Sequence, residues 1–376
     1  MKPGSISEEV GRRLSPVSSV TARAYTIPTD APEADGTLDW TETTIVIVEV
    51  EAAGQRGLGY TYTNRAAATL IDSLLADVVH GRSAMDVSGC WVAMCAAIRN
   101  VGRPGIAATA IAAVDAALWD LKARLLDLPL VSLLGSVHSA IDVYGSGGFT
   151  SYSIERLQRQ LAEWVQQGIT RVKMKIGRDP AGDLARVRAA RQAIGHGPEL
   201  FVDANGALSR KQALAIASAL EQFGVTWFEE PVSSDDLEGL RMMRDRAPAG
   251  MDIAAGEYGY DLFYFRRMLD AGAVDVLQAD ATRCAGITGF LQVAALCDAF
   301  GLPLSAHTAP SLHLAPCCAS GRAHHIEYFH DHARIEQMLF DGAARPRPDG
   351  RLYPDLSRPG LGLDFKRRDA APFEVI

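Results

Sequence analysis

Three carboxylates follow short apolar segments at nearly constant intervals along the chain. Asp203 ends "LFVD", Glu229 ends "TWFE" and Glu257 follows "DIAAG", so the acids lie 26 and 28 residues apart. Short apolar segments that alternate with amphipathic helices indicate parallel strands joined by crossover helices, and the strand ends gather at one face of a closed barrel. There the three acids would form an all-oxygen site suited to one Mg²⁺ ion. The alternative is three unrelated ion pairs or helix-capping acids.

Two neighbours of these acids share their segments. Glu230 follows Glu229 directly. Adjacent strand residues face opposite sides, so one of the two glutamates belongs to the metal site, and the spacing does not say which. Asn205 lies two residues after Asp203 and therefore faces the same side of its strand.

A pair of lysines precedes the first acid by the same interval. Lys173 and Lys175 in "RVKMK" point to the same side of a strand, and Lys175 lies 28 residues before Asp203. At roughly 6.6 Å apart they would repel each other by about 2.5 kcal/mol at an effective dielectric constant of about 20. Such repulsion would lower one lysine pKa by roughly two units, towards the range of a general base, with nearby carboxylates offsetting part of this effect. Two solvated lysines on an edge strand are the alternative.

A histidine and two more acids end later segments: Asp280 in "VLQAD", His307 in "PLSAH" and Glu327 in "HHIEYF". If Asp280 pairs with His307, the carboxylate fixes the imidazole tautomer and raises the basicity of the other nitrogen. Burial could keep the Glu327 carboxyl neutral and make it a proton donor, although a plain ion-pair partner fits nearly as well. The histidines of "HHIEYFHDH" alternate across a strand and continue into a loop, so we expect no zinc site within this stretch.

The elements that position these residues are predicted to form a complete barrel that follows a smaller domain in the chain. Thr-, Val- and Ile-rich segments near 19–30 and 41–52, followed by helical patterns, predict an α+β domain over residues 1–130. The fold class is therefore α/β, a (β/α)8 barrel over residues 131–335 with an N-terminal α+β cap, and a Pro- and Gly-rich segment, 336–376, that returns to the cap. The predicted barrel strands are 140–148, 171–177, 199–206, 226–231, 251–257, 274–280, 303–307 and 324–329.

Composition argues against several classes of partner. The net charge of −8 and the isoelectric point of about 5.6 argue against nucleic acid and anionic membranes. No segment approaches the roughly 18 uninterrupted apolar residues of a membrane span. The six cysteines show no paired motif. We expect a cytoplasmic protein with reduced thiols and no nucleic-acid or membrane partner.

In this order and at strand ends, the polar residues resemble those of the enolase superfamily and, within it, the mandelate racemase subgroup. "KMK" resembles the subgroup's KxK motif. The resemblance implies that Lys175 is the base, and that Lys173 holds the substrate carboxylate and lowers the pKa of Lys175. It likewise implies that Asp280 and His307 form a His–Asp dyad and that Glu327 hydrogen-bonds the developing enolate.

The same resemblance extends to the metal site and to the cap. It implies one Mg²⁺ per chain on Asp203, Glu229 and Glu257, with Glu230 outside this ligand set. In such proteins, loops of the N-terminal domain close over the barrel mouth and select the substrate. Here those loops would be roughly 27–41 and 57–64, and their aromatic residues would contact the substrate: Trp40, Tyr60 and Tyr62.

The implied reaction is removal of the proton α to a carboxylate, giving a metal-stabilised enolate. The resemblance favours dehydration of a sugar acid, a 2,3-dihydroxy acid, to a 2-keto-3-deoxy acid, with His307 helping the hydroxyl to leave. The alternatives are a racemase or epimerase of a 2-hydroxy acid such as mandelate, using Lys175 and His307 on opposite faces, and an inactive metal-binding barrel. The expected partner is a small carboxylate, and we expect a homo-oligomer.

Overall fold

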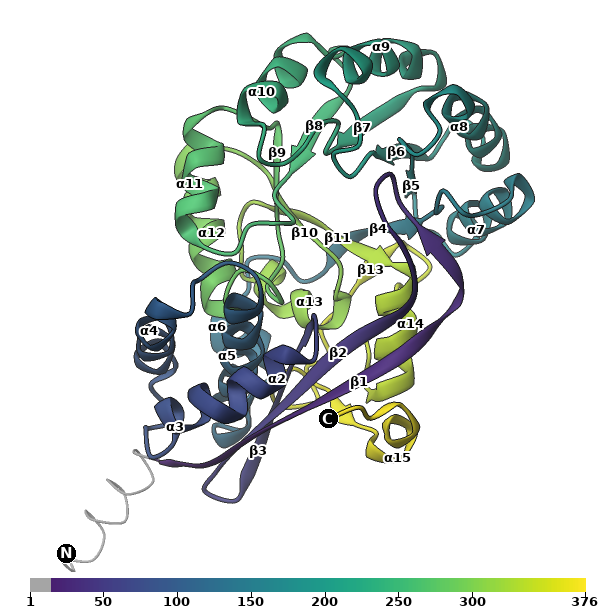
Figure 1. Ribbon diagram of the computed structural model, residues 1–376. Helices are drawn as coiled ribbons and strands as arrows, with labels where there is room; N and C mark the ends of the chain where they lie inside the picture. Colours follow the sequence, from purple (N-terminus) through teal and green to yellow (C-terminus); the bar gives the residue numbers. More distant parts are fainter. Residues whose placement is uncertain (1–14) are drawn as a thin grey trace, which may run out of the picture.

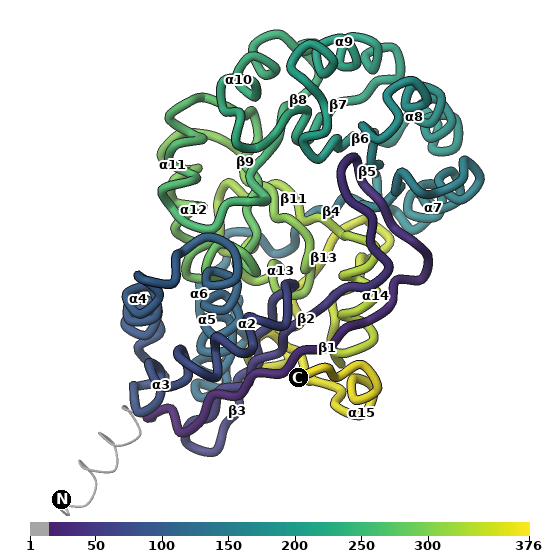
Figure 2. Tube along the Cα trace, viewed as in Figure 1, coloured from purple at the N-terminus to yellow at the C-terminus, as the bar shows by residue number. Residues whose placement is uncertain are grey.

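The computed structural model describes residues 15–376, so residues 1–14 of the expected cap lie outside the described part of the chain. An antiparallel sheet and its helices precede a parallel barrel (Figures 1 and 2). The sheet has the order β1–β2–β3, with β1 spanning Val17–Ala34, β2 Asp39–Ala52 and β3 Gln55–Tyr62.

The cap helices pack closely on this sheet. A Cβ atom at Gly59 on β3 would lie 2.1 Å from the carbonyl oxygen of Ala113, so glycine allows the long cap helix α5 to approach the strand. The helices are α2 (Ala66–Leu70), α3 (Ala76–Val79), α4 (Val87–Ala97), α5 (Ile106–Leu125) and α6 (Leu130–Leu134), with a π-helical turn, Ile71–Leu75, between α2 and α3.

Parallel strands β4 to β11 form the barrel, and pairing of β11 with β4 closes it. Each predicted strand is present, which confirms the enolase-like (β/α)8 architecture. The strands are β4 (Ile141–Gly147), β5 (Arg171–Lys175), β6 (Glu199–Asp203), β7 (Val225–Glu229), β8 (Asp252–Ala255), β9 (Val276–Ala279), β10 (Leu304–Ala306) and β11 (Ala323–Phe329).

Helices surround the barrel and alternate with its strands (Figure 1). Two of them begin at a serine N-cap. Ser153 accepts a hydrogen bond from the backbone nitrogen of Arg156, and Ser209 forms a capping box with Gln212. The helices are α7 (Ile154–Gln166), α8 (Pro180–Ile194), α9 (Arg210–Leu220), α10 (Leu237–Arg246), α11 (Leu262–Asp270), α12 (Gly286–Phe300), α13 (Pro310–Cys318) and α14 (His330–Leu339).

Strand register separates a packed interior from a polar end of the barrel. Lys175 pairs with Asp203, and Asp203 pairs with Glu229, so three polar side chains lie at one level. Two residues earlier on their strands, Phe201 pairs with Trp227, and both rings belong to a buried cluster inside the barrel. Period-2 alternation thus places large apolar side chains beneath the polar residues and closes the barrel below them.

The β1–β2 hairpin lies across the barrel end (Figure 1). Its tip is tightly seated, because a Cβ at Gly36 would lie 2.5 Å from the carbonyl oxygen of Ala204. The two cap loops, predicted at 27–41 and 57–64, are shorter in the structure than these ranges. β1 continues to Ala34 through a register shift after Pro28, and β3 continues to Tyr62.

The C-terminal segment contacts both parts of the chain. Its strand β13 (Arg351–Leu352) pairs antiparallel with β4 of the barrel, and the backbone nitrogen of Val375 donates to the carbonyl oxygen of Ala24 in the cap. The remaining elements of this segment are β12 (Phe340–Asp341), β14 (Asp364–Phe365) and α15 (Arg367–Ala370).

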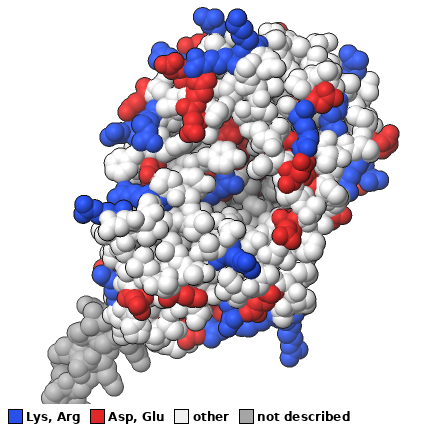
Figure 3. Space-filling view, viewed as in Figure 1, with Lys and Arg blue, Asp and Glu red and all other residues white. Residues whose placement is uncertain are grey.

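Charged side chains of both signs are mixed over the face that carries the hairpin (Figure 3). The helices within residues 15–376 include none long and apolar enough to cross a membrane.

Candidate active site

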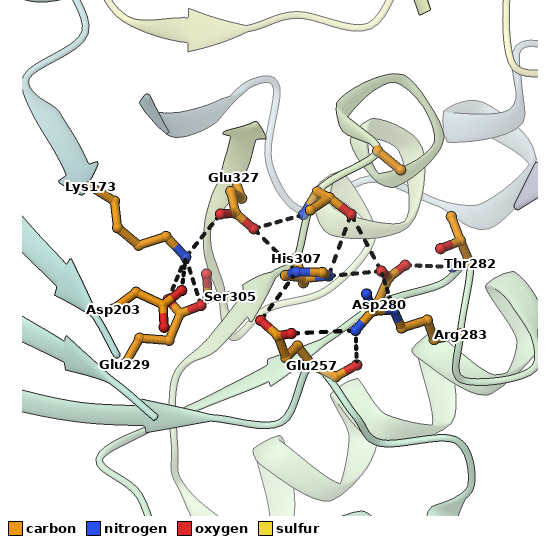
Figure 4. A network of polar contacts seen from close by, with 12 residues as sticks. Lys173, Asp203, Glu229, Glu257, Asp280, Thr282, Arg283, Ser305, His307 and Glu327 are labelled. Carbon is orange, nitrogen blue, oxygen red and sulfur yellow. Dashed lines mark hydrogen bonds and ion pairs between the residues drawn. The ribbon is translucent and has the colours of Figure 1, made fainter. Parts of the chain in front are cut away.

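Three predicted metal ligands meet at the polar end of the barrel (Figure 4). Asp203 and Glu229 end β6 and β7, and Glu257 follows β8. One carboxylate oxygen from each lies within 4.8 Å of the other two, and all three side chains are buried. Buried carboxylates this close repel one another, so the donor set fits a hard divalent cation.

The adjacent glutamates take different places. Glu229 belongs to the three-acid cluster, whereas Glu230 follows the end of β7 with a φ of +38°. Glu230 is nevertheless buried, and burial together with the charge of Glu257 raises its pKa well above the usual range. Asn205, also at positive φ, donates its backbone N–H to Asp203 Oδ1 over 2.8 Å. Both residues therefore lie beside the cluster.

Both lysines face the acids. Lys173 Nζ lies 2.6 Å from Glu229 Oε1 and 2.8 Å from Glu327 Oε1, and Lys175 Nζ lies 2.5 Å from Asp203 Oδ2. The predicted lowering of a lysine pKa is wrong for this arrangement. Burial lowers both lysine pKa values, but attraction to Glu229 for Lys173 and to Asp203 for Lys175 outweighs burial and raises them. The paired acids offset the mutual repulsion of the lysines completely.

The predicted dyad is present. His307 Nδ1 lies 2.8 Å from Asp280 Oδ2, and its Nε2 lies 3.3 Å from Glu257 Oε2. Burial lowers the pKa of His307, but Glu257 and Glu327 outweigh it and raise the pKa to about 9. The imidazole is therefore oriented by one acid and presents its other nitrogen to the metal-ligand cluster.

Of the two alternatives for Glu327, the structure favours the ion-pair partner over the neutral acid. Burial raises its pKa, but Lys173 and His307 lower it further, to about 2. Its Oε2 also accepts the backbone N–H of Thr308 over 3.1 Å. In this arrangement the Glu327 carboxylate is charged and holds Lys173.

Arg283 is a site residue that the sequence reasoning missed. Its Nη1 lies 3.0 Å from the carbonyl oxygen of Glu257, and its Nε lies 3.7 Å from Asp280 Oδ2 (Figure 4). The guanidinium also lies over the ring of Tyr258. Arg283 thus links a metal ligand to the dyad. The strand-end pattern does not mark it, because it lies three residues after Asp280.

The three cap aromatics lie in different environments. Trp40 donates from Nε1 to Glu33 and packs edge-on against Phe149, which follows β4. Tyr62 stacks on His332 with ring centroids 3.4 Å apart. Tyr60 is fully buried and its hydroxyl lies 2.6 Å from Glu336 of α14. The structure thus brings Tyr60 into the packing between cap and barrel.

Comparison with known proteins agrees with this arrangement. The family model described as "Mandelate racemase / muconate lactonizing enzyme, N-terminal domain" matches residues 21–135, and "Enolase C-terminal domain-like" matches residues 156–370. L-talarate/galactarate dehydratase of Salmonella typhimurium is 32% identical over 87% of this chain and 82% of its own length. Other relatives are named as sugar-acid dehydratases and cycloisomerases.

Solved structures show the same architecture. A mandelate racemase/muconate lactonizing enzyme-like protein from Rubrobacter xylanophilus is 53% identical with a TM-score of 0.94, covering 96% of this chain and all of its own. A racemase from Streptomyces coelicolor with bound magnesium is 30% identical with a TM-score of 0.90, over 96% of this chain and 100% of its own. The chain belongs to the enolase superfamily and, within it, to the mandelate racemase subgroup.

Proposed function

We propose that the protein is a Mg²⁺-dependent sugar-acid dehydratase that converts a 2,3-dihydroxy acid into a 2-keto-3-deoxy acid. The observation that carries this proposal is that Lys175 and the Asp280–His307 dyad reach one carboxylate cluster from different strands, β5 and β10. Relatives named as dehydratases, including L-talarate/galactarate and arabinonate dehydratases, support it.

The chain's own residues provide for each proton movement. Asp203, Glu229 and Glu257 would hold Mg²⁺, which would supply Lewis-acid stabilisation of negative charge at the substrate carboxylate. Release of Lys175 from Asp203 removes the attraction that raises its pKa, and the deprotonated amine then accepts the α-proton. The imidazolium of His307 gives a proton to the departing β-hydroxyl, so that the C–H and C–O bonds break and water leaves. Tautomerisation of the resulting enol gives the keto acid.

Buried polar atoms around the site support a hydroxylated substrate. Asn205 Oδ1, Glu230 Oε1 and His332 Nδ1 are buried, and none has a hydrogen-bond partner among the residues described. Buried polar atoms are normally satisfied, so a ligand rich in hydroxyl groups would provide the missing partners better than an aryl group.

A racemase or epimerase is the second candidate, because the same two bases could exchange a proton on opposite faces and a structural relative is named a racemase. Incubation with a panel of sugar acids and 2-hydroxy acids in D₂O with Mg²⁺ separates the two. A keto acid detected by NMR and chemical assay supports the dehydratase. Deuterium at the α-carbon without keto acid supports the racemase and contradicts the dehydratase. Lys175→Ala should abolish exchange from one face.

A further inference from the structure

A second cluster of potential metal ligands lies where the cap hairpin meets the barrel. Asp30 and Glu33 lie on β1, and His330 begins α14, 300 residues after Asp30 in the chain. One donor atom from each residue lies within 4.8 Å of the other two. The cluster shares no residue with the acids of the active site.

Glu33 supplies the first indication of a ligand. Its side chain is 1% exposed, and its Oε2 accepts the Trp40 indole N–H over 2.8 Å. Its other oxygen, Oε1, is buried without a hydrogen-bond partner anywhere in residues 15–376. Burying a carboxylate oxygen without a donor or a cation is costly: burial, with the charge of Asp331, raises the pKa of Glu33 to about 8, and a bound cation would remove that cost.

The two oxygens of Asp30 contact different residues. Oδ1 accepts from Arg156 Nη2 over 3.1 Å, while Oδ2 lies 3.1 Å from His330 Nε2. Glu33 is therefore held through one oxygen, whereas Asp30 is held through both, and an ion would replace the contact between Asp30 Oδ2 and His330 Nε2. Carboxylates that bind metals are commonly oriented by an outer hydrogen bond to one oxygen, as Trp40 and Arg156 provide here.

The cluster is accessible from solvent. Asp30 and His330 line a cleft of about 470 Å³ together with Arg156 and Glu163. The side chains of Asp30 and His330 are 40% and 24% exposed, whereas Glu33 is buried and does not line the cleft. An ion could therefore enter through the cleft and reach all three side chains.

We propose that Asp30, Glu33 and His330 bind one Zn²⁺ ion that fastens the cap hairpin to the barrel. An imidazole nitrogen with two carboxylate oxygens suits Zn²⁺, whereas Mg²⁺ prefers oxygen ligands alone. The histidines of the 324–332 stretch do not form this site among themselves. One of them joins two acids from the cap, which sequence spacing could not reveal.

The Zn²⁺ ion would bind the β1–β2 hairpin, which lies across the barrel end. The hairpin already contacts the loop after β4, where Thr150 donates its backbone N–H to Ala34 and its hydroxyl to the carbonyl oxygen of Asp35, each over 2.8 Å. A metal bound by β1 and α14 would add a link from the same hairpin to a second element of the barrel. Zn²⁺ should therefore raise the melting temperature of the whole chain.

The test is Zn²⁺ content after dialysis of the full-length protein against micromolar Zn²⁺ with millimolar Mg²⁺, measured by mass spectrometry of the metals. We expect one Zn²⁺ per chain. Glu33→Gln, which keeps the side-chain shape, and His330→Ala should each weaken Zn²⁺ binding by roughly tenfold or more. Glu163→Gln, in the same cleft but outside the cluster, should bind Zn²⁺ as the wild type does.

A second measurement separates the two metal sites and guards against misfolding. Glu257→Gln alters the active-site acids and should leave Zn²⁺ content unchanged, and the Zn²⁺-dependent rise in melting temperature should vanish only in the Glu33 and His330 variants. Absence of Zn²⁺ from the wild type would overturn the proposal and leave Asp30 and His330 as an ion pair. Retention of Zn²⁺ by both cluster variants, or its loss in Glu257→Gln, would overturn it equally.

Discussion

Asp280 Oδ2 lies 2.8 Å from His307 Nδ1, and this contact decides which nitrogen of the imidazole faces the metal-ligand cluster. The backbone N–H of Thr282 donates to the other oxygen, Oδ1, over 2.7 Å, so the carboxylate is itself held in place. A histidine fixed in this way can exchange a proton only through Nε2.

Asp280→Asn should therefore lower kcat by about 10²–10⁴-fold, because the amide neither fixes the tautomer nor stabilises the imidazolium. Steady-state kinetics with the substrate found in the D₂O panel would measure this. Mg²⁺ affinity should change little, since Asp280 is not among the three clustered acids. Asp275→Asn, just before the start of β9, is the matched control and should retain wild-type kcat. A fall of less than tenfold for Asp280→Asn would contradict the assigned role.

The pKa of His307 provides a prediction about Mg²⁺. In the metal-free protein it is raised to about 9, with Glu257 the largest influence after burial. Mg²⁺ on Glu257 would take up that charge, so metal binding should lower the pKa of His307. Because the pKa exceeds the unfolded value of about 6.5, this histidine stabilises the metal-free fold fully below about pH 6.5, and the contribution disappears as the pH rises through 9.

NMR titration of the imidazole signals, assigned with His307→Asn, would measure both values. His313 is an internal reference, because burial lowers its pKa. An unchanged His307 pKa on saturation with Mg²⁺ would show that the metal does not bind at Glu257.

Arg283 should couple metal binding to the dyad, because its guanidinium contacts both Glu257 and Asp280. Arg283→Met should weaken Mg²⁺ binding by roughly 10–100-fold, as loss of residues that orient metal ligands commonly does, and should lower kcat as well. Arg283→Lys should recover part of the loss, since it restores charge without the planar fork. Calorimetric titration with Mg²⁺ would measure this, with Arg244→Met as the surface control. Wild-type affinity in Arg283→Met would disprove the coupling.

The barrel and its site residues could be predicted because each barrel strand combines an apolar segment with a polar residue at or near its end. Asp203, Glu229 and His307 all lie where that pattern placed them. Protonation states could not be predicted in this way. Lys175 has a raised pKa because its Nζ lies 2.5 Å from Asp203 Oδ2. That distance depends on the conformations of two side chains on neighbouring strands, which the sequence pattern does not specify.

The cap was less predictable for a different reason. The loop expected at 27–41 contains Pro28 and Pro32, but β1 includes both in a register shift and pairing with β2 resumes at Glu33. Arg283 was missed because it follows its strand by several residues and therefore carries no strand-end signal.

Tyr60→Phe tests whether the buried cap tyrosine serves packing or substrate binding. Its hydroxyl lies 2.6 Å from Glu336, whose pKa burial raises to about 7, so the variant leaves a buried carboxyl short of a donor. We expect the free energy of unfolding to fall by about 1–3 kcal/mol with an unchanged KM. Urea denaturation and steady-state kinetics would measure the two quantities, with Tyr353→Phe, whose hydroxyl bonds exposed Asp349, as the control. A higher KM at unchanged stability would instead place Tyr60 against the substrate.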